Sequence, residues 1–383
     1  MLRASAFLLL AVTSFAAELP RGQIIDAVPC LADATQSYAL YLPSNYSPQR
    51  RWNVILAFDA GGRGRMPVER FQAAAEKYGY IVAGSLNSRN GPLNVSVAAG
   101  NAMWKDVEAR FSVDKTRLYT TGQSGGSRVA MYLAMHRDAF SDAPAGVIAS
   151  SAGFPGPDAP ESLPFPVFAT AGTEDFNHLE MRQFDQHLQS RHRLAIFDGG
   201  HAWLPAPLAM TAIEWMEIDA MKTGLRAKDA AEIDAIFAAR VQSARESKEV
   251  AARYLAMTEL ASDFNGLKDV KEFMAEAARL QKDHAVQAAF ERDTALDERE
   301  DQLSGTLLEL AAQLRYPSRR AKSMEALKTS VAGVSAAATA PADSAERQMS
   351  RRVLRGLMAS SRDVRDEDFQ ALMEKLRSDV GRF

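Results

Sequence analysis

A serine flanked by glycines is the residue group most able to do chemistry. The run Thr121-Gly122-Gln123-Ser124-Gly125-Gly126 contains the pattern Gly-x-Ser-x-Gly, between a strand-like stretch at 117–120 and a helix-like one at 128–136. In that setting the pattern predicts a nucleophile elbow, a sharp turn on which the serine side chain stands clear of the sheet. Glycines two residues before and after leave room where backbone segments crowd. We therefore expect Ser124 to attack a carbonyl carbon.

A serine hydroxyl needs a base to take its proton, and a histidine base needs a carboxylate to orient it. Asp175 follows the strand-like stretch 167–171, and His201 follows the strand-like stretch 194–197. Both residues come just past the carboxyl ends of strands, where an open α/β sheet places its ligands. The order Ser124, Asp175, His201 predicts a catalytic triad with His201 as base and Asp175 as the orienting acid.

Other assignments of the acid and the base remain open at this stage. Glu174 is expected to point away from His201, and Asp198 is too close along the chain to reach its Nδ1. Asp175 could instead serve a turn or a helix N-cap, and His201 could simply bond a backbone carbonyl. The remaining histidines are expected to cap a helix or lie on the surface: His136, His178, His187, His192 and His284.

An oxyanion formed by this attack needs backbone N–H donors. One should come from a neighbour of Ser124, either Gln123 or Gly125, and we favour Gly125. The other should come from Ala60 or Gly61, in the loop after the apolar strand 54–58. The glycines of that loop could equally form only a tight turn.

The elements that must position these residues alternate between strand and helix over residues 20–223. Strands are expected at 24–29, 38–42, 54–58, 80–84, 117–120, 146–149, 167–171 and 194–197, and helices at 68–78, 97–111, 128–136, 178–191 and 207–222. Such alternation predicts an α/β fold whose mostly parallel sheet is covered by helices on both faces.

From residue 224 to 383 glycine and proline become rare, which predicts an all-α region. Residues 251–280 are expected to form a helical hairpin broken at Asp263-Phe264-Asn265-Gly266. A third helix is expected around Leu303, Leu307, Leu310 and Leu314, and two more at 344–360 and 366–380. The alanine-rich stretch 335–342 is expected to be a flexible linker. The pair Arg351-Arg352 is expected on a solvated helix face.

The overall composition narrows the class of protein. With 383 residues, 47% hydrophobic residues and a net charge of −3, the chain can bury a sizeable core and carries no basic excess typical of nucleic-acid binding. Residues 1–16 have the charge, short apolar run and small residues of a cleaved signal peptide, which predicts export to the periplasm or the outside. The single cysteine, Cys30, is expected to be buried and inert. No cofactor or metal motif is present, and we expect neither.

Together these pieces resemble the α/β-hydrolase superfamily, near its secreted esterase, feruloyl-esterase and polyhydroxybutyrate-depolymerase-like branch. The resemblance rests on Tyr38-Ala39-Leu40-Tyr41-Leu42-Pro43, Gly122-Gln123-Ser124-Gly125-Gly126, Gly172-Thr173-Glu174-Asp175 and Gly199-Gly200-His201-Ala202-Trp203. It covers residues 36–222, about half of the chain, and implies the triad Ser124, Asp175 and His201. The hairpin at 251–280 weakly resembles a tetratricopeptide-type repeat.

The chain departs from this family in the oxyanion loop. Such esterases usually have His-Gly after the third strand, whereas this chain has Phe58-Asp59-Ala60-Gly61-Gly62. A negative charge on Asp59 should slow acyl transfer unless the side chain turns away. The expected function is that of an exported serine hydrolase acting on small-molecule or polymer-borne esters. A serine peptidase is one alternative. The other is a binding protein with a weak hydrolase domain, whose helical tail holds a protein partner.

Overall fold

An eight-stranded sheet forms the centre of the first half of the protein. The computed structural model describes residues 19–156 and 159–381, so the predicted signal peptide at 1–16 lies outside the described residues. The sheet has the order β1-β2-β4-β3-β5-β6-β7-β8. β1 and β2 are antiparallel to their neighbours, and β3 to β8 run parallel. The strands are β1 (Ile24–Pro29), β2 (Ser37–Tyr41), β3 (Trp52–Asp59), β4 (Tyr80–Ser85), β5 (Val113–Gln123), β6 (Gly146–Ser150), β7 (Val167–Gly172) and β8 (His192–Phe197).

Helices cover both faces of this sheet, as the alternating sequence predicts. Side chains from α2 (Leu93–Arg110), α3 (Gly125–Met135) and α4 (His178–His187) join one apolar cluster, and those of α1 (Arg65–Tyr78) and α5 (Ala206–Thr223) join another. Successive residues of β3 alternate between them: Val54 and Leu56 face the first cluster and Ile55 the second. A strand buried on both faces explains the continuous apolar run in its sequence.

The single cysteine lies in the first of these clusters. Cys30 is buried, and burial, together with the nearby Asp106 carboxylate, raises the pKa of its thiol to about 11. At neutral pH the group is therefore a thiol rather than a thiolate, which agrees with the expected inert role.

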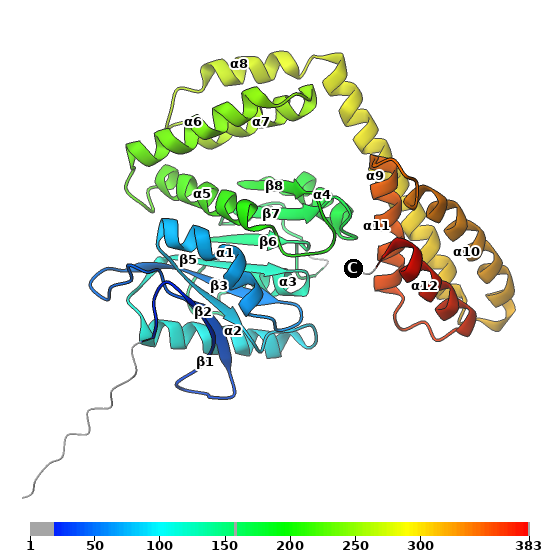
Figure 1. Ribbon diagram of the computed structural model, residues 1–383, viewed down its shortest axis with the longest axis horizontal. Coiled ribbons are helices and arrows are strands. Elements are labelled where there is room, and N and C mark those ends of the chain that lie inside the picture. Colours follow the sequence, from blue (N-terminus) through cyan, green and yellow to red (C-terminus); the bar gives the residue numbers. More distant parts are fainter. Residues whose placement is uncertain (1–18, 157–158, 382–383) are drawn as a thin grey trace, which may run out of the picture.

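The second half of the chain is helical. Its elements are α6 (Ala230–Glu246), α7 (Val250–Phe264), α8 (Lys271–Leu280), α9 (His284–Gln313), α10 (Pro317–Ala338), α11 (Ala345–Ser360) and α12 (Glu367–Val380). α6 to α8 pack on the end of α5, and α9 runs from there into a bundle with α10, α11 and α12 (Figure 1). The hairpin expected at 251–280 is confirmed as α7 and α8. Its likeness to a tetratricopeptide repeat stays a prediction, because many helical folds contain such a hairpin.

The structure corrects two expectations for this region, the first of them in part. Of the expected linker 335–342, residues 335–338 are instead the last residues of α10, with Ala338 fully buried in the bundle, and only 339–342 lie between α10 and α11. Alanine has the highest helix propensity of all residues, so an alanine-rich stretch with an apolar surface to pack against continues a helix. Arg352 is also buried rather than solvated. Its partners belong to elements distant in the sequence, which a local charge pattern cannot reveal.

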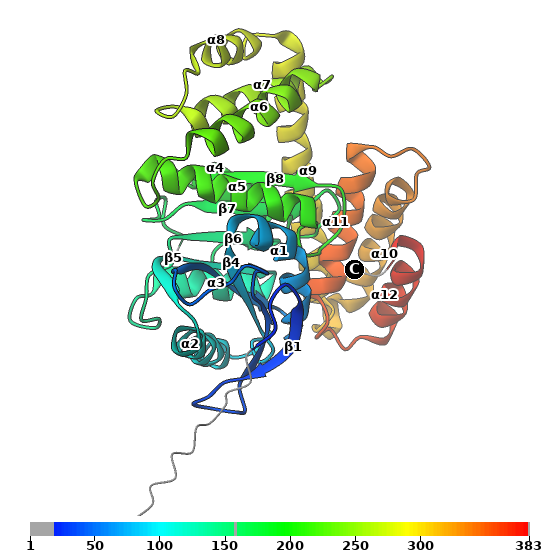
Figure 2. The same ribbon diagram turned by 60° about the vertical axis from the view of Figure 1, so that its left-hand side comes forward.

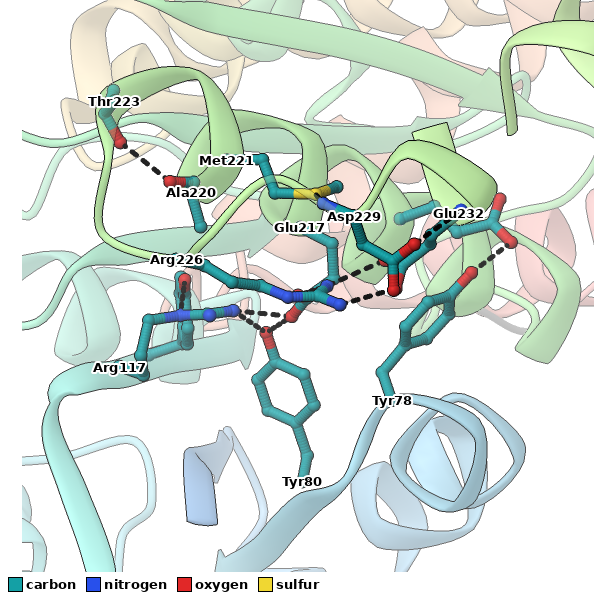
Figure 3. Close-up of polar contacts among 12 residues, drawn as sticks. Tyr78, Tyr80, Arg117, Glu217, Ala220, Met221, Thr223, Arg226, Asp229 and Glu232 are labelled. Carbon is teal, nitrogen blue, oxygen red and sulfur yellow. Dashed lines mark hydrogen bonds and ion pairs between the residues drawn. The ribbon is translucent and has the colours of Figure 1, made fainter. Parts of the chain in front are cut away.

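A network of charged side chains, buried at its centre, joins the sheet-containing half of the chain to the start of the helical half (Figure 3). The carboxylate of Glu217 on α5 accepts hydrogen bonds from Arg117 on β5, from the Tyr80 hydroxyl on β4, and from Arg226. Arg226 also pairs with Glu232 in the first turn of α6. The network thereby ties two central strands to the point where the helical region begins.

The bundle of α9 to α12 lies on the side of the sheet to which the arrowheads of the parallel strands point (Figures 1 and 2). That is the edge where the sequence places Ser124, Asp175 and His201. Within the described part of the chain, none of the helices is both long and apolar enough to cross a membrane.

Candidate active site

The predicted nucleophile elbow is present. Ser124 follows the last residue of β5 and precedes the first residue of α3, with φ 57° and ψ −123°. This is a strained conformation for a residue with a side chain. A Cβ on Gly122 would lie 2.1 Å from the Gly126 carbonyl oxygen, and one on Gly126 would lie 2.0 Å from that of Phe58. Both glycines are therefore required for the close approach of backbone on which the turn depends.

His201 and Asp175 form a hydrogen-bonded pair. Nδ1 of His201 lies 2.7 Å from Oδ1 of Asp175, whose side chain is completely buried. The same carboxylate oxygen accepts the backbone N–H of Asn177 at 2.8 Å, so Asp175 also supports the turn that leads into α4. The two roles that the sequence leaves open for Asp175 are thus filled by one side chain.

The loop that carries His201 extends over the end of the strand that carries Ser124. The carbonyl of Ala202, the residue after His201, accepts a hydrogen bond from Ser151, the residue just after β6, and the Trp203 indole donates to Asp59 at the end of β3. Because β5 lies between β3 and β6, a loop that reaches both neighbours passes over the carboxyl end of β5. Ser124 stands at that end.

The hydrogen bonds of the described residues do not include one between Ser124 and His201. Such bonds often form or shorten only when substrate is bound. The ring of Phe176 stacks on the His201 imidazole, with centroids 3.9 Å apart and an interplanar angle of 27°. The side chain of His201 is 12% exposed, so the imidazole is largely shielded but still reachable from solvent.

The two other acidic residues near His201 have different partners. Glu174 pairs with Arg351 and Arg355 on α11, and Asp198 accepts a hydrogen bond from the Thr173 hydroxyl at 3.2 Å. Asp175 is therefore the carboxylate that orients His201 in this structure.

The charge of Asp59 is fully compensated. Its side chain is buried and accepts hydrogen bonds from the backbone of Gly61, from the guanidinium of Arg63 through Nε and Nη2, and from the Trp203 indole at 2.8 Å. Burial alone would raise the pKa of Asp59, but the hydrogen bonds outweigh it and the pKa lies below its usual value. A carboxylate neutralised in this way does not repel a developing oxyanion as an unpaired one would.

This pairing corrects one of the two donors expected in the oxyanion loop. The Gly61 N–H donates to Asp59 at 2.8 Å and so is not free for an oxyanion. Among the hydrogen bonds of the described residues, none uses the N–H of Ala60 or of Gly125. These two groups remain as the candidate donors.

Asn90 is a neighbour of this site that sequence reasoning did not single out. Its backbone N–H donates to the Ala60 carbonyl at 2.8 Å, and a Cβ on Gly125 would lie only 1.7 Å from its Oδ1. The side-chain amide therefore lies against the nucleophile elbow. Its only signal in the sequence was its place in the loop Asn87–Asn94, which follows β4.

A mostly apolar pocket of about 500 Å³ is lined in part by Arg128, which lies on α3 one helical turn after Ser124. Its walls include Phe154, Phe184 and the ion pair of Arg128 with Glu180. Part of its lining, including Gly153, Phe154 and Gly156, comes from the loop after β6.

His178 is a second correction, because it is buried rather than on the surface. Its Nδ1 lies 2.9 Å from the Gly172 carbonyl oxygen. Burial, reinforced by the nearby Arg352 guanidinium, lowers the pKa of His178 to about 4.

Across residues 19–156 and 159–381, no group of three or more acidic, histidine or cysteine side chains is arranged to hold a metal ion.

The sheet order, the elbow after β5 and the order Ser124, Asp175, His201 together define residues 24–223 as an α/β-hydrolase fold. No family model and no curated protein matches the chain. Among solved structures it is similar to the feruloyl esterase module from Clostridium thermocellum, with 15% identity, a TM-score of 0.40, and 50% of this chain and 85% of that chain covered.

Two further esterase structures are similar to the same extent. For an esterase from Pyrobaculum calidifontis the identity is 13% and the TM-score 0.43, with 52% of this chain and 86% of that chain covered. For the esterase Est2 from Thermogutta terrifontis the identity is 17% and the TM-score 0.37, with 51% and 90% covered.

Proposed function

We propose that this protein is an exported serine hydrolase that cleaves carboxylic esters through an acyl-enzyme. The observation that carries the proposal is the hydrogen bond between His201 and the buried Asp175, in a loop that passes over Ser124 on its strained elbow. A serine, an oriented imidazole and two unused N–H groups are the parts that acyl transfer requires.

In the proposed reaction the Ser124 oxygen attacks the ester carbonyl carbon while Nε2 of His201 accepts the hydroxyl proton. The N–H groups of Gly125 and Ala60 stabilise the resulting oxyanion. The intermediate collapses by releasing the alcohol, which takes the proton back from His201. Water, deprotonated by His201, then attacks the acyl-enzyme and frees the acid and Ser124. Asp175 keeps Nδ1 protonated throughout, so that Nε2 is the nitrogen that accepts.

The test is covalent labelling by a fluorophosphonate together with hydrolysis of short nitrophenyl esters. We expect both in the full chain and neither in Ser124→Ala. A folded protein that is not labelled would overturn the proposal and favour the binding-module alternative, in which the helical half holds a protein partner.

Turnover of peptide substrates but not of esters would favour the peptidase alternative instead. Because the similar structures include a feruloyl esterase module, the ester panel should contain methyl ferulate beside the short-chain esters.

A further inference from the structure

Three arginines on one helix of the C-terminal bundle contact the loop that carries the triad acid. On α11, Arg352 donates to the carbonyl of Thr173 at 2.8 Å, and Arg355 donates to the carbonyl of Glu174 at 3.0 Å. The Glu174 carboxylate pairs with Arg351 at 2.7 Å and with Arg355 at 2.8 Å. The two residues immediately before Asp175 are therefore held by side chains from about 180 residues later in the chain.

These contacts complete the hydrogen bonding of the loop backbone. The N–H groups of Thr173 and Glu174 donate to the carbonyls of Phe197 and Gly199, both in the segment that leads to His201, at 2.8 Å each. Their carbonyls accept from the two guanidiniums. With every N–H and C=O paired, the path of the loop is fixed from both sides: by the His201 segment and by α11.

One of these arginines is itself held in place by the bundle. Arg352 forms a buried, bidentate ion pair with Glu300 on α9, in which Nε lies 2.9 Å from each carboxylate oxygen. Arg182 on α4 pairs with Asp297, one turn earlier on α9, at 2.7 Å. A planar guanidinium fixed in this way presents its remaining donors in one direction, which a lysine could not do.

The same helix also lies against the residues around the catalytic base. A Cβ on Gly356 would lie 3.9 Å from the Cβ of Phe176, the residue whose ring stacks on His201. A Cβ on Gly200, the residue before His201, would lie 3.5 Å from Nη1 of Arg355. α11 therefore touches the surroundings of both Asp175 and His201.

We infer that Arg352 and Arg355 are positioning residues of the triad, and that the helical half of the chain is a structural part of the active site rather than an independent appendage. The inference rests on the proposed function, because it concerns the same triad. The sequence alone would lead us to expect that a chain ending near residue 224 keeps activity on small esters. The contacts of α11 argue against this expectation.

The test uses the full chain with Arg355→Met. We expect kcat for a short nitrophenyl ester to fall at least about tenfold while KM changes less than about twofold, because a small displacement of the acid loop misorients His201 without altering ester binding. Arg355→Lys should recover only part of the loss, because it keeps the charge but not the fork of donors.

Arg240→Met is the matched control. Arg240 is another largely shielded arginine of the helical half, on α6, with a side chain 15% exposed against 10% for Arg355, and it pairs with Asp263 instead of the acid loop. The Arg240→Met variant should have a lower melting temperature, as Arg355→Met does, and an unchanged kcat. A folded Arg355→Met protein with wild-type kcat would overturn the inference, and so would an equal loss of kcat in Arg240→Met.

If Arg355→Met does not fold, the variants Arg352→Lys and Arg355→Lys provide the same test, and unchanged kcat in both would also overturn the inference.

A readout independent of turnover separates this inference from the proposed function. The low-field proton resonance of His201 Nδ1–H reports its bond to Asp175. We expect it in the wild type and in Arg240→Met, and expect it to weaken or vanish in Arg355→Met. If the wild type hydrolyses no ester but the resonance behaves in this way, the proposed function fails and the positioning role stands.

Discussion

The Trp203 indole donates a hydrogen bond of 2.8 Å to the buried carboxylate of Asp59, 144 residues earlier in the chain. Asp59 ends β3 and begins the loop that contains the candidate oxyanion donor Ala60, and Trp203 follows His201 by two residues. One hydrogen bond therefore joins the loop that would stabilise the oxyanion to the loop that carries the base. The sequence alone suggests that the negative charge of Asp59 would slow acyl transfer. In the structure, the Asp59 side chain instead connects the two loops.

Replacing Trp203 by Phe should weaken both the fold and the chemistry. The variant removes the Trp203 hydrogen bond and leaves Asp59 Oδ2 with Arg63 as its remaining partner. Loss of a buried hydrogen bond to a charged group costs about 1–3 kcal/mol in the free energy of unfolding. We expect a lower kcat for ester hydrolysis as well, because the two loops lose their link. Urea unfolding and steady-state kinetics measure the two effects.

Trp215→Phe provides the control for this prediction. The Trp215 indole also donates to a buried aspartate, Asp263, at 2.8 Å, but far from the site. The Trp215→Phe variant should lower the free energy of unfolding by a similar amount without changing kcat. Equal kinetic effects in the two variants would show that the Trp203 bond has no special role in activity.

Asp175→Asn should abolish most of the activity without unfolding the protein. An amide that donates to His201 favours the wrong tautomer, an effect that costs about 10⁴-fold in kcat in triad hydrolases. Asp198→Asn is the comparison variant, because Asp198 is near His201 in sequence but bonds the Thr173 hydroxyl. It should keep kcat within about threefold, since no triad group is lost. Activity that depends on Asp198 instead would show that the acid is misassigned.

Glu217→Leu should destabilise the protein by about 3–5 kcal/mol, because it leaves Arg117 buried without its carboxylate partner. The side chains of the pair are only 4% and 2% exposed. Glu214→Leu, on the same helix, removes a more exposed pair with Lys77 and should cost less than about 1 kcal/mol. Chemical denaturation measures the free energy of unfolding of the two variants. Equal losses of stability would contradict the role given to the buried network.

The stability of the protein should depend on pH through His178. Its pKa is about 4 in the folded protein and 6.5 in the unfolded chain, so between these values the unfolded chain binds more protons. Stability is therefore complete above pH 6.5 and falls as the pH is lowered, by about 2 kcal/mol at pH 5 from this residue. The groups around the imidazole are Arg352, Arg182 and Asp175.

His178→Asn isolates this contribution, because its amide can still donate to the Gly172 carbonyl but does not titrate. The variant should lose less stability than the wild type between pH 7 and pH 5, as measured by denaturant titration at each pH. Identical pH dependence in the two proteins would show that His178 is accessible to protons in the folded state.

The amino-acid sequence by itself determined the features that depend on local pattern. The alternation of strands and helices, the elbow at Ser124 and the placement of Asp175 and His201 after successive strands all follow from periodicity, glycine positions and chain order. Each of these signals lies within a few residues, and backbone conformation is decided at that range.

Tertiary structure decided which partners the charged side chains have. Asp59 accepts a hydrogen bond from a tryptophan 144 residues away, and the backbone of the acid loop is held by arginines 179 and 181 residues further on. The pattern Arg351-Arg352 resembles any solvated helix face, and His178 resembles any histidine in a polar helix. Whether such a face meets solvent or another element depends on how α11 and α9 pack against the sheet. That packing is set by the sum of many distant contacts, none of which leaves a local trace in the sequence.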